Sequence, residues 1–235
     1  MAAAEEARAL APSDPDPPPR RAAILTAWLG VIQGVLLLVS AWLLSRVPGP
    51  KASDAELVDF YTSEASQVIV VVGLYLMPFA AIAFLWFAVA LRMWVARSTV
   101  KLDVLLSNVQ LVSAIVFITL FLAGAAASTV LAVSVEFMEA PLDPATARLF
   151  PQFGSSLLLV FGMRMAAMFV FTTSRIASNH RLLPRWFVWV GYVVGLFLLL
   201  VATLSKWLFL VFPVWILVLS VLLLLKVRRI PSSQP

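Results

Sequence analysis

Long windows without charged residues dominate the chain between residues 22 and 225. Five of them contain no Asp, Glu, Lys or Arg, and a sixth, 149–174, is interrupted only by Arg164. A helix rises 1.5 Å per residue and the hydrocarbon core is roughly 30 Å thick, so about 20 apolar residues span a bilayer. The pattern predicts an all-α polytopic membrane bundle with six transmembrane helices, at about 22–45, 67–91, 104–133, 153–175, 186–205 and 207–226.

Lys and Arg are unevenly shared between the segments that flank these windows. If the flanking segments are numbered along the chain, the first, third, fifth and seventh together hold twelve Lys and Arg residues. The second, fourth and sixth together hold four. Short cytoplasmic loops carry the excess of Lys and Arg, so the odd-numbered segments and both termini are predicted to be cytoplasmic. The spans then form one membrane domain, 22–228, between cytoplasmic tails at 1–21 and 229–235. We expect the first tail, with its five prolines, to be disordered.

The composition mainly excludes certain classes of protein and of functional site. Of the 235 residues, 62% are apolar and 12% charged, which excludes an ordinary soluble domain and a disordered chain. The net charge of +5 follows from the topology, so we expect the lipid bilayer, and no nucleic acid, as a partner. The chain has no cysteine, a single histidine (His180), and no HExxH, GxSxG or P-loop motif. We therefore expect no catalytic residue, no metal site, no cofactor and no enzymatic activity.

A short helix is predicted outside the membrane, between the first two spans. Ser53 and Glu56 have the spacing of a capping box, which marks the start of a helix. Leu57, Val58 and the neighbouring pair Phe60–Tyr61 share one face of that helix. We expect it to lie on the membrane surface or to dock over the bundle.

Small residues mark the predicted contacts between helices. Gly30 and Gly34 in the first span, and Gly191 and Gly195 in the fifth, have the GxxxG spacing that lets helix backbones approach closely in lipid. The next span after each pair carries a proline, so the two helix pairs suggest a parallel internal repeat. Chance similarity of apolar sequence is the alternative explanation.

Arg164 is the residue with the clearest chemical potential. It lies near the middle of its window, where a charged side chain needs a polar partner, and no charge-free window contains a carboxylate. The nearest acids in the sequence are Glu136 and Glu139, at the end of the third span. Arg164 is therefore interpreted either as a site for an anionic or carbonyl-bearing ligand, or as a structural residue that clamps helices or extends along its own helix. Its predicted neighbours are Gln33, Tyr75, Thr119, Tyr192 and the Leu74 carbonyl, which Pro78 leaves without a donor.

Three apolar motifs carry a resemblance to known proteins. They are Phe84-Leu85-Trp86-Phe87, Leu183-Pro184-Arg185-Trp186-Phe187 and Phe212-Pro213-Val214-Trp215. With six spans and an excess of arginine over lysine, the chain resembles multi-pass membrane proteins of high-GC bacteria that have no assigned activity. The resemblance implies a location in the bacterial cytoplasmic membrane.

Two functions fit these observations. The first is a non-enzymatic bundle that acts by association within the membrane, either with itself or with another membrane protein, through its glycine faces. The alternative is a small permease or lipid-handling protein whose binding site is built around Arg164, Gln33 and the helix break at Pro78.

Overall fold

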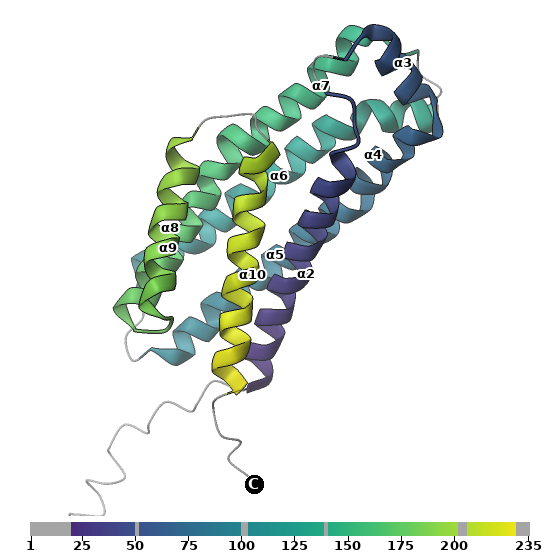
Figure 1. The fold of residues 1–235 in the computed structure, drawn as a ribbon. Coiled ribbons are helices and arrows are strands. Elements are labelled where there is room, and N and C mark those ends of the chain that lie inside the picture. Colours follow the sequence, from purple (N-terminus) through teal and green to yellow (C-terminus); the bar gives the residue numbers. More distant parts are fainter. Residues whose placement is uncertain (1–19, 50–51, 100–102, 139–140, 202–205, 229–235) are drawn as a thin grey trace, which may run out of the picture.

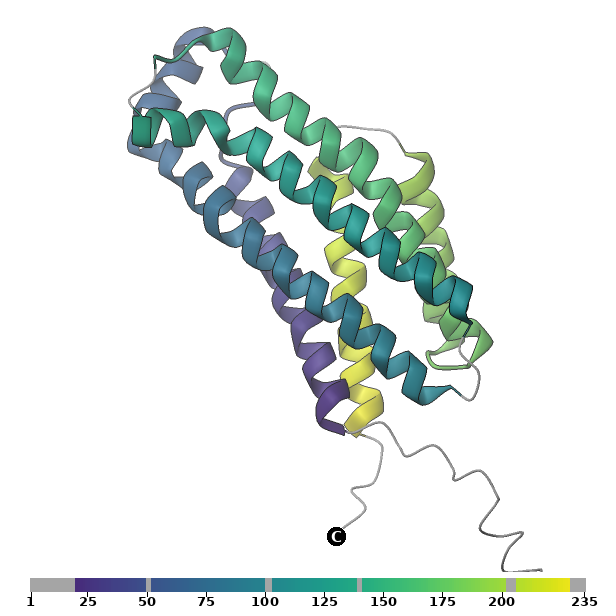
Figure 2. The same ribbon diagram turned by 180° about the vertical axis from the view of Figure 1, so that it is seen from behind.

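The computed structural model describes residues 20–49, 52–99, 103–138, 141–201 and 206–228, and every regular element within them is a helix. The all-α prediction is confirmed for this part of the chain. The helices run side by side in an elongated bundle (Figures 1 and 2). In chain order its passes are α2 (Arg20–Leu44), α4 to α5 (Gln67–Val71 and Met77–Ser98, joined by the π-helical segment η2, Val72–Leu76), α6 (Val104–Met138), α7 to α8 (Pro144–Ser156 and Met163–Asn179, joined by the π-helical segment η3, Leu157–Gly162), α9 (Arg185–Leu200) and α10 (Lys206–Arg228).

Five of these passes are long and apolar enough to cross a membrane. The candidate spans are Ala23–Leu44, Glu64–Ser98, Val104–Met138, Pro144–Asn179 and Trp207–Lys226. The sixth pass, α9, has 16 residues and is about 24 Å long, which is short for a span. The predicted span 186–205 exceeds α9, and its residues 202–205 lie outside the described part. A full set of six spans therefore stays a prediction.

The start of α2 and the end of α10 lie at the same end of the bundle, which we call the termini end (Figure 1). An even number of passes produces this arrangement. The opposite end holds α3 and the beginning of α7, and we call it the cap end. Residues 1–19 and 229–235, which include most of the two predicted tails, lie outside the described residues, and the cytoplasmic placement of the termini stays a prediction.

Phenylalanine rings fill the centre of the bundle. The ring of Phe84 on α5 lies 5.4 Å from that of Phe117 on α6, 5.3 Å from that of Phe169 on α8 and 5.5 Å from that of Phe212 on α10, measured between centroids. All three contacts are edge-on, which is a favourable geometry for aromatic pairs. The four side chains are fully buried. Four helices are thus joined through one apolar cluster.

Both predicted glycine pairs lie against helices of the same chain. A Cβ placed on Gly30 would lie 2.8 Å from the ring of Phe87, and one on Gly34 would lie 2.5 Å from the side chain of Leu217. Helix α2 is therefore seated closely between α5 and α10. On α9, a Cβ at Gly195 would lie 3.1 Å from the ring of Phe171, so α9 is seated on α8. These faces serve packing inside the chain.

The suggested internal repeat has no counterpart in this packing. Helix α2 packs along α5, whereas α9 packs along α8 and touches α10 only slightly. If the two helix pairs were copies of one unit, α9 would pack along α10 as α2 packs along α5.

The small residues of α6 contact both π-helical passes. A Cβ on Gly73, in η2, would lie 2.7 Å from the Thr129 hydroxyl oxygen of α6. A Cβ on Gly124 of α6 would lie 2.8 Å from the carbonyl oxygen of Gly154 on α7. Helix α6 itself has 35 residues and a length of about 52 Å, so it extends beyond a bilayer at one end or both.

The cap end forms a small core of its own. Helix α3 (Asp54–Thr62) begins with the predicted capping box, in which Ser53 and Glu56 bond reciprocally, and this prediction is confirmed. Helix α3 docks over α6 and α7, with Leu57 and Tyr61 buried and Val58 exposed. The cluster at this end consists of Leu57, Tyr61, Ile69, Val70, Ala132 and Ala147.

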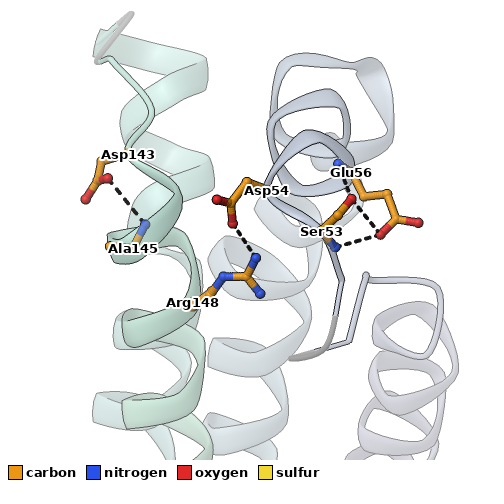
Figure 3. Close-up of polar contacts among 6 residues, drawn as sticks. All are labelled: Ser53, Asp54, Glu56, Asp143, Ala145 and Arg148. Atoms are coloured by element: carbon orange, nitrogen blue, oxygen red, sulfur yellow. Dashed lines mark hydrogen bonds and ion pairs between the residues drawn. The ribbon is translucent and has the colours of Figure 1, made fainter.

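The fourth pass begins earlier than the predicted residue 153. Asp143 caps α7 by accepting hydrogen bonds from the backbone N–H groups of Ala145 and Thr146, and Pro144 occupies the first helical turn. Arg148, one turn further along, forms an ion pair with Asp54 of α3 (Figure 3). Part of the segment between the third and fourth predicted spans is therefore helical and is joined to α3.

Candidate functional site

Arg164 lies in the first turn of α8, close to the middle of its pass. It is 16 residues from Arg148 towards the cap end and 11 from Arg175 towards the termini end. The helix rise converts these separations to about 24 Å and about 16 Å. If the pass crosses a bilayer, Arg164 lies deep within the hydrocarbon core.

The guanidinium of Arg164 is bound to its own helix. Its Nη1 donates a hydrogen bond to the carbonyl oxygen of Val160, one turn earlier in η3. In this segment the N–H of Met163 bonds to the carbonyl of Leu158, five residues back, so the regular α-helical ladder is interrupted. The Val160 carbonyl is the acceptor that the structure gives to Arg164 among the described residues. This placement matches the structural interpretation, in which the side chain extends along its own helix.

The other predicted site residues do not gather around Arg164. Gln33 is 1% exposed on α2, which packs between α5 and α10 and not along α8. Tyr75 is 56% exposed on η2, and Thr119 is exposed on α6 with its hydroxyl on the Ile115 carbonyl. Tyr192 on α9 packs against other rings, with its centroid 6.3 Å from that of Phe171. The sequence placed these residues at similar depths, but the bundle puts them on different sides.

The Leu74 carbonyl belongs to η2, on a different pass from Arg164. Here the N–H of Met77 reaches back five residues to the carbonyl of Val72, just before Pro78. A π-helical turn therefore accommodates the missing N–H of the proline. The same kind of interruption, η3, supplies the acceptor for Arg164 on its own pass.

Carboxylates are distant from Arg164 along the bundle. Measured along the helices from the contact between Gly124 and Gly154, Asp103 lies about 16 Å and Glu136 about 33 Å from the level of Arg164. The early start of α7 moves Arg164 away from Glu136, so Asp103, at the start of α6, is nearer in depth than sequence order indicated. Glu139, the other expected neighbour, lies outside the described residues.

One side of α8 is only partly covered by the rest of the bundle. We call this surface the α8 strip and define it by Phe161, Arg164, Met165 and Met168, which are exposed or half-buried while the opposite side of α8 is buried. Helix α9 leaves the strip open at this level. Gly195 lies against Phe171 and the two helices run in opposite directions, so α9 ends, at Leu200, within about one turn of the level of Arg164.

Two buried glutamines carry polar atoms without partners. Both amide atoms of Gln33 lack a hydrogen bond among the described residues. Gln110 of α6 donates from Nε2 to the hydroxyl oxygen of Thr173 on α8 at 2.7 Å, but its Oε1 lacks a donor. Sequence reasoning did not single out Gln110 and Thr173, although each is a polar residue inside an apolar stretch.

A small cavity adjoins Gln110 near the termini end. It lies between α5, α6, α8 and α10, has a volume of about 10 Å³ and is lined mainly by apolar side chains, with Gln110 and Thr173 among its polar members. Close by, the ammonium of Lys226 donates to the carbonyl of Leu182 at 2.8 Å and lies 5.4 Å from the centroid of the Trp94 ring. These contacts join the end of α10 to α5 and to the turn between α8 and α9.

Charge at the cap end gathers on α3 and on the start of α7. Hydrogen bonds from the backbone N–H and the hydroxyl of Ser53 hold the pKa of Glu56 below its usual value (Figure 3). The backbone N–H groups of Thr146 and Ala145 lower the pKa of Asp143 in the same way. Burial raises the pKa of Tyr61. The two carboxylates stabilise helix starts, which accounts for their positions without a ligand.

Comparison with known proteins gives no relative: no family model matches the chain, and neither a curated protein nor a solved structure is significantly similar to it.

Proposed function

We propose that this chain is a non-enzymatic, membrane-embedded helix bundle that works by association with another membrane protein. The observation that carries the proposal is the position of Arg164: the charged side chain at membrane depth lies on the partly exposed α8 strip. A charge at this depth is expensive to maintain in lipid, and such residues generally serve a function.

The packing of the bundle supports association in preference to transport. A permease built around Arg164 needs that residue and Gln33 at one internal site, and the two lie on passes that do not pack together. Between them, the bundle centre is occupied by the rings of Phe84 and its neighbours. The glycine faces are used within the chain, so the α8 strip, and not those faces, is the surface that we assign to association.

We further propose a cytoplasmic-membrane location with both termini in the cytoplasm. The described arginines at the ends of α5, α8 and α9, which are Arg92, Arg97, Arg175, Arg181 and Arg185, lie toward the termini end, whereas Arg46 and Arg148 lie toward the cap end. This asymmetry is what the distribution of Lys and Arg across a cytoplasmic membrane produces.

Photocrosslinking in host membranes tests the association. A photoreactive phenylalanine analogue at Phe161, on the α8 strip, is compared with one at Val193, which is exposed on α9. We expect a discrete protein adduct from position 161 and none from position 193. Equal labelling at both positions, or lipid adducts alone, would contradict association through the strip.

A further inference from the structure

The chemistry of Arg164 restricts what can bind beside it. A guanidinium is permanently charged and has five N–H donors in a planar fork, and among the described residues Arg164 uses this fork on one acceptor, the Val160 carbonyl. A backbone carbonyl carries only a partial charge, so the described part of the chain supplies no counter-ion for the guanidinium. A carboxylate is the group that matches both the charge and the fork geometry.

Among the residues that the structure describes, no carboxylate lies at the required depth. The charge-free windows contain none, and Asp103 and Glu136 lie about 16 Å and about 33 Å from the level of Arg164. A second copy of the chain has the same sequence and therefore lacks one as well. A two-fold contact through the strip would bring two arginines together, which is repulsive. The carboxylate that pairs with Arg164 must therefore belong to a different molecule.

The α8 strip has the form of a contact surface for a helix. Phe161, Arg164 and Met168 follow one another at intervals of three and four residues, which aligns them along one side of a helix. Met165 flanks them, and methionine side chains adapt to irregular apolar partners. The end of α9 near Leu200 leaves this surface partly uncovered. The π-helical turn before Arg164 holds its guanidinium at the same surface.

Building on the proposed function, we propose that the α8 strip is the docking surface for a transmembrane helix of a different protein that carries an Asp or Glu at mid-bilayer depth. The carboxylate accepts two hydrogen bonds from the free edge of the Arg164 guanidinium, and apolar side chains of the partner cover Phe161 and Met168. The partner is thus identified by one acidic residue within an otherwise apolar span.

A synthetic probe tests this directly. The full chain, labelled with a fluorophore on a single cysteine introduced at the open position Gly49, is reconstituted in phosphatidylcholine vesicles with a labelled poly-leucine span that carries one central Glu. We expect energy transfer to report binding about tenfold tighter than that of the same span with Leu in place of Glu. Arg164→Leu should abolish the difference, and Arg164→Lys should retain part of it.

Charge reversal separates specific pairing from a folding defect. Arg164→Glu should lose the Glu-bearing span and gain one with a central Arg, while helix content measured by circular dichroism stays unchanged. Equal binding of the Glu and Leu spans to the unsubstituted chain, or equal binding of the Glu span to Arg164→Leu, would overturn the proposal. If the adduct at Phe161 in host membranes persists in Arg164→Leu, association through the strip holds and the acidic partner is wrong. If no adduct forms at all, the proposed function itself fails.

Discussion

The backbones of Gly124 on α6 and Gly154 on α7 meet: a Cβ on Gly124 would lie 2.8 Å from the Gly154 carbonyl oxygen. No side chain fits at this point unless the helices separate. The contact fixes the register of the whole α7–η3–α8 pass against α6. It thereby sets the depth of Arg164, ten residues further along.

Replacement of Gly154 by alanine should destabilise the bundle. The new methyl group would lie 2.8 Å from the backbone nitrogen of Ser128, so the backbones must move apart. Overpacking of this kind costs about 1–3 kcal/mol. Gly49→Ala is the matched control, because nothing lies within 4 Å of a Cβ there. Equal thermal melting of the two variants in detergent would argue against this helix register.

The bond from Gln110 to Thr173 should couple α6 to α8. Thr173→Val leaves the Gln110 amide without an acceptor, at a cost of about 1–3 kcal/mol. Gln110→Leu together with Thr173→Val should cost less than the sum of the single changes, with a coupling energy of about 0.6–2 kcal/mol. Thr119→Val serves as the control, because the Thr119 hydroxyl donates to the Ile115 carbonyl of its own helix. The effect of this change on stability should be additive with that of Gln110→Leu. If the effects of Gln110→Leu and Thr173→Val on the free energy of unfolding were fully additive, the hydrogen bond between the two residues would not form.

Gln33→Leu should stabilise the chain. The Gln33 amide is buried without partners among the described residues, and an unsatisfied buried amide costs about 1–3 kcal/mol. Leucine removes that cost and keeps a similar volume, so the midpoint of denaturation should rise. Gln152→Leu, at an exposed position of α7, should leave it nearly unchanged. A loss of stability in Gln33→Leu would mean that the amide has a partner such as a bound water.

The cap end should loosen in acid. Glu56 and Asp143 have lowered pKa values in the folded chain, so they stabilise the starts of α3 and α7 above an unfolded pKa of about 4. That contribution is lost as the pH falls through their folded pKa values. Hydrogen exchange, corrected for intrinsic rates, should show protection falling at residues 54–62 and 144–150 as the pH approaches 3.

Asp143→Asn provides the control for this prediction. Asparagine caps a helix about as well as aspartate but does not titrate. The start of α7 should therefore keep its protection in acid, while the start of α3 still loses it. If both helices loosen in the variant as in the unsubstituted chain, titration of Asp143 is not the cause.

Local signals in the sequence predicted some features well. The capping box at Ser53 and Glu56 concerns only neighbouring residues, so it could be identified without knowledge of the fold. The start of α7 has a similar signal, because Asp143 followed by Pro144 is a cap followed by a residue preset for the first helical turn. The predicted fourth span began only at residue 153, so this earlier start was missed.

Features that depend on which helices adjoin could not be predicted. The sequence places Gln33 and Arg164 at similar depths, but only the packing of α2 against α5 and α10 shows that the two residues lie apart. The π-helical turn that supplies the Val160 carbonyl has no recognised sequence signature. Gln110 was missed because its partner, Thr173, is 63 residues away in the chain.

Accessibility measurements on spin labels test the central claim most directly. Labels at Phe161 and Met168, with Arg164 kept, are compared in lipid nanodiscs with labels at Val193 on α9 and at exposed Ser63 near the cap end. If the α8 strip faces lipid, the labels at 161 and 168 should collide often with oxygen and rarely with a water-soluble nickel complex, as the label at 193 should. The label at 63 should show the opposite pattern. Frequent nickel collisions at 161 and 168 would place Arg164 beside water and contradict the account.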